Sequence, residues 1–113
     1  MKPPRDPYGY IVGLFVDRLV ESLKRQGIET QGDGVKRLVR EPPNPDYGDL
    51  GVPVHKYARE LGLNPVELAT RIASDIAGTE NVLWARQLAG YVNIKYDPVY
   101  IARLLYSCIY IEA

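Results

Sequence analysis

The sequence predicts an α+β fold with a small antiparallel sheet packed against about four helices, and three observations lead to this class. Residues 10–25 carry apolar side chains at three- and four-residue spacings, as an amphipathic helix does. Residues 91–96 alternate between two kinds of side chain, as a strand does, and the tight link Ala89-Gly90 joins them to a second predicted strand at 82–88. The predicted order is helix, strand, two helices, two strands and helix, a grouping typical of α+β domains.

The N-terminal third of the chain is predicted to hold an arm, a helix and a turn. Residues 1–9 contain three prolines and one glycine and suggest a flexible N-terminal arm. The first helix is expected over Tyr10–Arg25, with Gly27 as its stop signal. Residues 28–34 include two glycines and an aspartate and suggest a turn or hairpin loop. The apolar residues that define the helix are Ile11, Leu14, Phe15, Leu19, Val20 and Leu23.

The next segment is expected to form a strand and then a second helix. Val35–Arg40 pairs two apolar residues with flanking cations, which suits a strand with one wet face. We expect the charges of Lys36, Arg37 and Arg40 to form a solvated sheet edge, with RNA contact as the alternative. The prolines of residues 42–45 prevent regular structure. Asp49 is a plausible cap for the second helix, and Pro53 is tolerable there only in the first turn.

The remaining two helices have strong start signals. Asn64-Pro65-Val66-Glu67 places a capping amide, a first-turn proline and a glutamate in order, which predicts a third helix that ends at Gly78. Asp97-Pro98 predicts, by the same device, a last helix that reaches Ile111. No internal repeat or low-complexity tract interrupts residues 10–113, so one domain is expected after the arm.

Composition excludes several classes of function. Fourteen basic and fourteen acidic residues give zero formal charge, which argues against a non-specific nucleic-acid binder, so any RNA contact must be local and geometric. Cys108 is the single cysteine and His55 the single histidine, so no metal site, cofactor or catalytic centre is expected from them. The N-terminus does not resemble a signal peptide, and no apolar run reaches membrane-spanning length. We expect a cytoplasmic protein.

The run Tyr91–Tyr96 carries the functional hypothesis. In a strand, Val92, Ile94 and Tyr96 point to one face and suit a core. The opposite face then carries a ring that can stack on a base, an amide that can read a base edge and a cation for phosphate, and such faces commonly read unpaired RNA bases. An ordinary half-exposed edge strand is the alternative. The three residues are Tyr91, Asn93 and Lys95.

Upstream motifs strengthen the RNA interpretation. The chain carries Pro45-Asp46-Tyr47-Gly48-Asp49, then Asn64-Pro65-Val66-Glu67-Leu68-Ala69, then Gly90-Tyr91-Val92-Asn93. In this order and spacing, residues of about 10–110 resemble the additional N-terminal domain of arginyl-tRNA synthetases, archaeal ones in particular. The resemblance implies binding to the D-loop side of a transfer RNA, most readily an arginine-specific one.

The resemblance also assigns residues to roles. It implies that the aromatic residue and the asparagine of the last motif contact the RNA, and these are Tyr91 and Asn93. Strand alternation, not the motif, adds Lys95 to this site as a phosphate contact. Arg86 on the neighbouring strand adds a second cation if the strand register places it on the same face. The catalytic signatures of the synthetase, His-Ile-Gly-His and Lys-Met-Ser-Lys-Ser, are absent from this sequence, so we expect a non-catalytic module without cofactors.

The last predicted helix supports a second hypothesis. Residues 99–111 carry a single charge, and a helix that is apolar all round is normally buried on more than one side. A domain of this size would leave part of it exposed to a partner. That partner is expected to be a full-length synthetase or a second copy, through Leu104, Leu105, Tyr106 and Ile109. The chain is interpreted as a stand-alone paralogue or an excised domain, and an interaction module that keeps the fold without RNA binding stays open.

Overall fold

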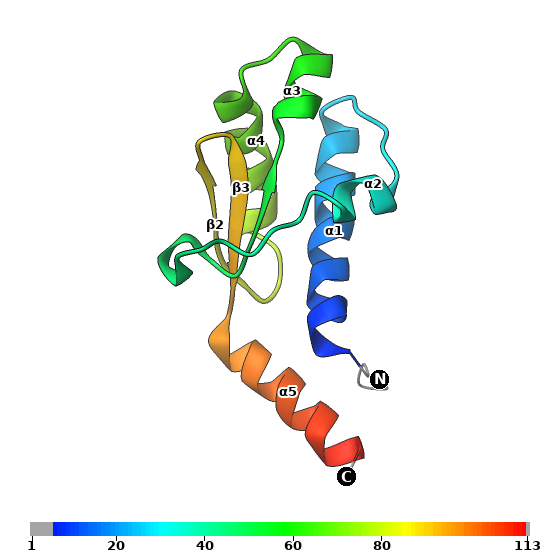
Figure 1. Ribbon diagram of the computed structural model, residues 1–113, viewed down its shortest axis with the longest axis vertical. Coiled ribbons are helices and arrows are strands. Elements are labelled where there is room, and N and C mark those ends of the chain that lie inside the picture. Colours follow the sequence, from blue (N-terminus) through cyan, green and yellow to red (C-terminus); the bar gives the residue numbers. More distant parts are fainter. Residues whose placement is uncertain (1–5, 113) are drawn as a thin grey trace.

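The computed structural model describes residues 6–112, with side chains described as far as Ser107. Within this part the chain forms five α-helices, one 3-10 turn and a three-stranded antiparallel sheet (Figure 1). The α+β class and the small antiparallel sheet are therefore confirmed. The elements are α1 (Pro7–Arg25), α2 (Gly32–Lys36), η1 (Pro45–Tyr47), β1 (Leu50–Pro53), α3 (His55–Leu61), α4 (Pro65–Ala77), β2 (Val82–Leu88), β3 (Tyr91–Tyr96) and α5 (Pro98–Glu112).

The sheet has the order β1-β3-β2, so β3 is its central strand. β3 pairs with β1 through Val52↔Val92 and with β2 through Arg86↔Asn93, both antiparallel. The β2–β3 link is a tight turn in which Ala89 and Gly90 have φ of 49° and 83°, as a two-residue hairpin turn of the primed type requires. This hairpin was predicted from the sequence and is confirmed at both strand boundaries.

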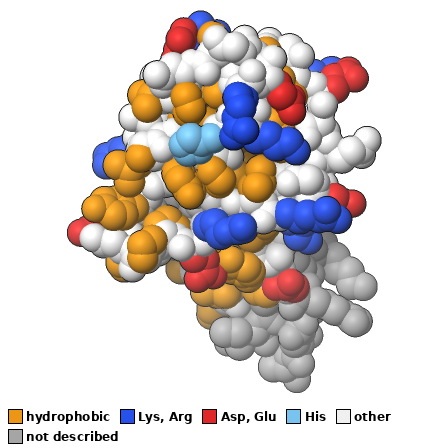
Figure 2. All heavy atoms as spheres, turned by 45° about the horizontal axis from the view of Figure 1, so that its top comes forward, with side chains coloured by type: hydrophobic (Ala, Val, Ile, Leu, Met, Phe, Trp, Pro, Cys, Tyr) orange, Lys and Arg blue, Asp and Glu red, His pale blue; other side chains and the backbone are white. Residues whose placement is uncertain are grey.

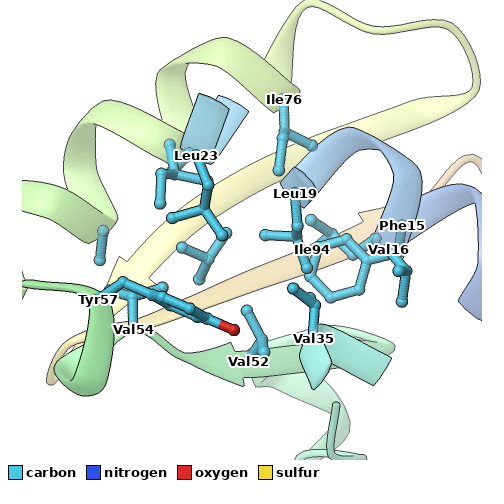
Figure 3. Packing of buried hydrophobic residues seen from close by; sticks show 14 of the residues in the cluster. Phe15, Val16, Leu19, Leu23, Val35, Val52, Val54, Tyr57, Ile76 and Ile94 are labelled. Atoms are coloured by element: carbon cyan, nitrogen blue, oxygen red, sulfur yellow. The ribbon is translucent and has the colours of Figure 1, made fainter. Parts of the chain in front are cut away.

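The core lies between the inner face of the sheet and helices α1 and α4. As the alternation predicts, Val92, Ile94 and Tyr96 point inward and are at most 4% exposed. Figure 3 shows how α1 side chains meet those of the strands and α4 across this core. Burial of such apolar surface is the main favourable term in folding. The labelled residues are Phe15, Val16, Leu19, Leu23, Val35, Val52, Val54, Tyr57, Ile76 and Ile94.

The predicted helix caps of α4 and α5 are also confirmed. The Val66 N–H donates to Asn64 Oδ1 at 2.8 Å, with Pro65 in the first turn of α4. The Val99 N–H donates to Asp97 Oδ1 at 2.9 Å, with Pro98 opening α5. Each capping side chain satisfies a backbone donor that the helix itself leaves without a partner.

The first helix begins earlier than predicted. Helix α1 begins at Pro7, not Tyr10, because the Asp6 carboxylate accepts a hydrogen bond from the Gly9 N–H at 3.0 Å and caps the helix. Residues 7–9 therefore belong to the helix. The rest of the predicted arm, residues 1–5, lies outside the described residues.

The strand predicted over Val35–Arg40 is wrong. Residues 32–36 form the short helix α2, which buries Val35 in the core at 1% exposure. Only Arg40 keeps a sheet contact, because its backbone exchanges two hydrogen bonds of 2.8 Å with Gly51. The loose alternation of this segment does not specify a strand, and α2 instead packs against α1 with Val35 in the core.

The role predicted for Asp49 is also wrong. A strand, β1, occupies Leu50–Pro53 where the first turn of the second helix was expected, and α3 begins at His55. The Asp49 carboxylate instead accepts a hydrogen bond from the Tyr96 N–H at 2.9 Å. The three residues after it are buried beside β3, so pairing with β3 outweighs the helix-start signal.

Helix α5 extends away from the rest of the domain (Figure 1). Among the described residues, no helix is long and apolar enough to cross a membrane.

Candidate RNA-binding face

The outer face of the sheet carries all four residues that the sequence singled out. Strand pairing places Arg86 opposite Asn93, so the register that the sequence left open is settled. Side chains of directly paired residues share a face, so Leu88 lies beside Tyr91 and Trp84 beside Lys95. The face therefore consists of three cross-strand rows, and β1 adds Gly51 and Pro53 to it.

Asn93 is more buried than an exposed base-reading amide would be. Its exposure is 6%, and none of the hydrogen bonds in the described part of the chain uses its side-chain amide. Polar side chains at this burial normally have a partner. The amide therefore keeps a donor and an acceptor available at the bottom of a depression.

Gly51 makes room for this amide. A Cβ atom at position 51 would lie 2.3 Å from Asn93 Oδ1, a distance that real Cβ contacts do not reach. The absence of a side chain on β1 thus lets the Asn93 side chain lie flat over the neighbouring strand. The sequence alone does not reveal the role of Gly51, because that role depends on a strand pairing that local patterns do not show.

A groove of about 350 Å³ opens above Asn93. Its floor comes from the sheet and from the β2–β3 turn. One wall comes from the segment between α2 and β1, which crosses the sheet in Figure 1. Most lining side chains are apolar or aromatic, as in a site for a flat organic group. The lining residues are Arg40, Glu41, Pro42, Pro43, Tyr47, Gly51, Leu88, Ala89, Tyr91 and Asn93.

Tyr91 borders the groove and is held from behind by His55. Its side chain is 38% exposed, and its ring meets the His55 imidazole edge to face with centroids 5.9 Å apart. His55 itself packs closely on Gly90, where a Cβ would lie 2.6 Å from Nε2. Figure 2 shows this histidine at the border of a group of hydrophobic side chains, with Lys and Arg side chains nearby. His55 thus supports the Tyr91 ring.

The two predicted cations lie on the same face but do not line the groove. Lys95 Nζ lies 3.6 Å from Asp49 Oδ1, with both side chains partly exposed, so part of its charge is already balanced. The Arg86 guanidinium lies over the Trp84 ring at 4.4 Å from the centroid, a cation–π contact that fixes its position. The structure thus brings Tyr91 and Asn93 together and leaves Lys95 and Arg86 along the adjoining surface.

The segment Arg40–Tyr47 is the part of the groove that sequence reasoning missed. Its prolines indicated irregular structure but not where it would lie. The Glu41 carboxylate raises the pKa of the nearby Tyr8 phenol, so this segment lies beside the first turn of α1. Among the described residues, no cluster of His, Cys, Asp and Glu side chains could hold a metal ion.

Comparison with known proteins assigns the family. Residues 16–96 match the model of the arginyl-tRNA synthetase N-terminal domain. The chain belongs to this family. It is 36% identical over 89 residues to an arginine–tRNA ligase of Ignicoccus hospitalis, and 35% identical over 97 residues to one of Aeropyrum pernix. The resemblance stated from the sequence motifs is therefore confirmed.

The matches cover most of this chain and little of the relatives. They span 78% and 81% of this chain but 14% of each relative. The solved arginyl-tRNA synthetase of Thermus thermophilus superposes with a TM-score of 0.60 at 25% identity, over 74% of this chain and 13% of that one. The shared part is thus an N-terminal domain of a much longer enzyme.

Proposed function

We propose that this domain binds transfer RNA by holding an unpaired loop base in the groove above Asn93. The observation that carries the proposal is the Asn93 amide, which is 6% exposed and lines the groove beside the Tyr91 ring. A nucleobase has apolar faces for stacking and a polar edge for hydrogen bonds, so it matches both features. The Asn93 amide can donate one hydrogen bond and accept another at that edge.

The family supports a transfer RNA as the source of this base. The relatives that match are named arginine–tRNA ligases, and the resemblance of the Gly90–Asn93 motif points to the D-loop side of an arginine transfer RNA. The module is non-catalytic in this proposal, because the matched region is confined to the N-terminal part of those enzymes. It acts in the cytoplasm, together with its RNA.

Arg86 and Lys95 serve as phosphate contacts beside the groove. Arg86 pairs with Asn93 across strands β2 and β3. Its guanidinium is held over the Trp84 ring. Removal of one phosphate-binding cation should make the log–log salt dependence of binding shallower by roughly 0.7–0.9. We expect Arg86→Ala and Lys95→Ala each to weaken binding to different transfer RNAs similarly, because phosphates carry no sequence information.

Binding of labelled arginine transfer RNA, followed by fluorescence anisotropy at low salt, tests the proposal. Tyr91→Ala should lower the affinity by about 1–3 kcal/mol, the value of one base stacked on an aromatic ring. Asn93→Ala should reduce the preference between transfer RNAs that differ at the bound base. Val66→Ala, which shortens an exposed apolar side chain on α4, is the control. A folded wild-type chain without measurable affinity would overturn the proposal.

A second candidate function, protein interaction, is supported by α5. Val99, Leu105 and Tyr106 are 57%, 46% and 61% exposed, which is unusual for large apolar side chains on one helix. Leu104, also assigned to this surface, is partly buried. The side chain of Ile109, the fourth residue assigned to it, lies outside the described residues, as does that of Cys108. The candidate partners are a second copy of the chain, through an isologous contact, and a full-length synthetase.

A further inference from the structure

We infer that Tyr47 is a second aromatic contact for the bound base, so that the groove holds the base between the sheet face and the segment Arg40–Tyr47. This inference rests on the proposed function and adds residues that the Gly90–Asn93 motif does not contain. Tyr47 lines the same groove as Tyr91 and Asn93. Its side chain is 45% exposed, so its ring has a free surface available for a ligand.

The backbone around Tyr47 is fixed before any ligand arrives. The Asp46 N–H donates to Asn44 Oδ1 at 2.9 Å, and the Tyr47 N–H donates to the Asn44 carbonyl at 3.0 Å. After the turn, the Asp49 N–H donates to the Ile94 carbonyl at 2.7 Å. The turn is thus attached to β3, the strand that carries Tyr91 and Asn93.

Gly48 allows the turn to lie this close to the sheet. Its φ is 110°, and a Cβ there would lie 2.5 Å from the Ile94 carbonyl oxygen and 3.0 Å from the Trp84 ring. At the other end of the segment, Arg40 exchanges two backbone hydrogen bonds of 2.8 Å with Gly51. The wall is therefore attached to the sheet at both ends, and binding a base does not have to order it, which lowers the entropic cost of binding.

The apolar walls and the polar floor of the groove together favour one class of ligand. Pro42, Pro43, Leu88 and the two tyrosine rings offer apolar contact surface, whereas the amide at the floor requires a hydrogen-bonding edge. A flat heteroaromatic base satisfies both requirements at once. Because the base must enter a groove, it has to come from an unstacked nucleotide in a single-stranded loop and not from a helical stem.

Transfer-RNA affinities of four variants test the inference. Tyr47→Ala should lower the affinity about tenfold or more, in the range measured for single base–aromatic contacts, whereas Tyr47→Phe, which keeps the ring, should stay within about threefold of wild type. Tyr91→Ala reports on the proposed function, and Val66→Ala, at a 45% exposed position on α4, is the control. Wild-type affinity for Tyr47→Ala together with a loss for Tyr91→Ala would overturn the second contact and leave the proposed function standing.

A second measurement links Tyr47 to a base directly. Transfer RNAs assembled from a synthetic 5′ half can carry one abasic nucleotide at each D-loop position in turn. On the RNA that lacks the bound base, Tyr47→Ala and wild type should bind equally, because the ring then has no base to stack on. An undiminished effect of Tyr47→Ala on every abasic RNA would contradict the inference. Absence of binding by the wild-type chain to any of the RNAs would instead remove the proposed function itself.

Discussion

In the proposed mode of RNA binding, recognition depends on the residue pair Asn93 and Gly51. The asparagine brings a donor and an acceptor to the floor of the groove, and the glycine opposite it leaves the space that the amide occupies. Both polar atoms of this amide stay open to water, because the described residues contain no sealed side-chain nitrogen or oxygen that lacks a hydrogen bond. A ligand edge with complementary hydrogen bonds would take the place of that water.

Gly51→Ala should impair RNA binding through Asn93. The new Cβ would meet Oδ1 at 2.3 Å, and the amide is the flexible partner, so it should turn away while the fold is kept. We expect affinity to fall as far as in Asn93→Ala, and the double variant to be no weaker than Asn93→Ala alone. Gly13→Ala, where the added Cβ meets nothing within 4 Å, should leave RNA affinity unchanged. Full affinity of Gly51→Ala would show that the amide takes no part.

Sequence reasoning reached Tyr91 and Asn93 but not the groove around them. The alternation of β3 places these residues on one face without knowledge of the rest of the chain. The burial of Asn93 and the contribution of Tyr47 depend on which segments pair and cross far along the chain. Local periodicity carries no information on such contacts, so these features appear only in three dimensions.

The helices and strands differ in how strongly local signals define them. Helix α4 has a cap, a first-turn proline and an apolar stripe that agree with one another, and both its ends were predicted. The β2–β3 hairpin has alternation and a short turn. By contrast, β1 has only four residues and follows a helix-like start signal, so its strand structure depends on pairing with β3.

The cap of α4 should contribute measurably to stability. Asn64→Ala removes the acceptor for the Val66 N–H and should lower the free energy of unfolding by about 1 kcal/mol. Urea denaturation followed by circular dichroism measures this change. Asn64→Asp keeps an acceptor oxygen near the positive end of the helix dipole and should stay close to wild type. Equal stability of Asn64→Ala and wild type would show that the cap is not needed.

At the scale of the domain, one tyrosine links the sheet to α1 across the core. The Tyr96 hydroxyl donates to the Ile11 carbonyl at 2.8 Å, and the ring lies 6.3 Å from that of Tyr100 at the start of α5. Burial raises the pKa of the Tyr96 phenol above its ordinary value of 10.0. Folding therefore favours the protonated form of this side chain.

The stability of the domain should fall at alkaline pH because of Tyr96. The raised pKa stabilises the fold fully below pH 10, the unfolded value, and this contribution is lost as the pH rises above it. At neutral pH, Tyr96→Phe should be less stable than wild type by about 1 kcal/mol, because it lacks the hydrogen bond of the hydroxyl. Between about pH 9 and pH 11, the free energy of unfolding of Tyr96→Phe should fall less than that of wild type. Urea unfolding of both proteins at about pH 9 and about pH 11 measures how much stability each one loses over this range. Parallel decreases in both proteins would exclude Tyr96 as the cause.

The exposed face of α5 should mediate association. Leu105→Glu places a charge at a 46% exposed position, which should prevent an apolar interface from forming, because an unpaired charge is costly to bury. Analytical ultracentrifugation should show wild-type self-association and a monomeric variant. Val66→Glu, at a 45% exposed position on α4, is the matched control and should behave as wild type. A wild-type chain that is monomeric at high concentration and captures no synthetase would contradict this role.

The side-chain amide signal of Asn93 tests base recognition most directly. In a ¹⁵N-labelled protein this signal can be assigned by its disappearance in Asn93→Ala. On titration with arginine transfer RNA, it should shift or broaden together with the Tyr91 backbone amide, while the Gln26 side-chain signal at the end of α1 stays in place. Binding that leaves the Asn93 amide unshifted would contradict recognition of a base in the groove.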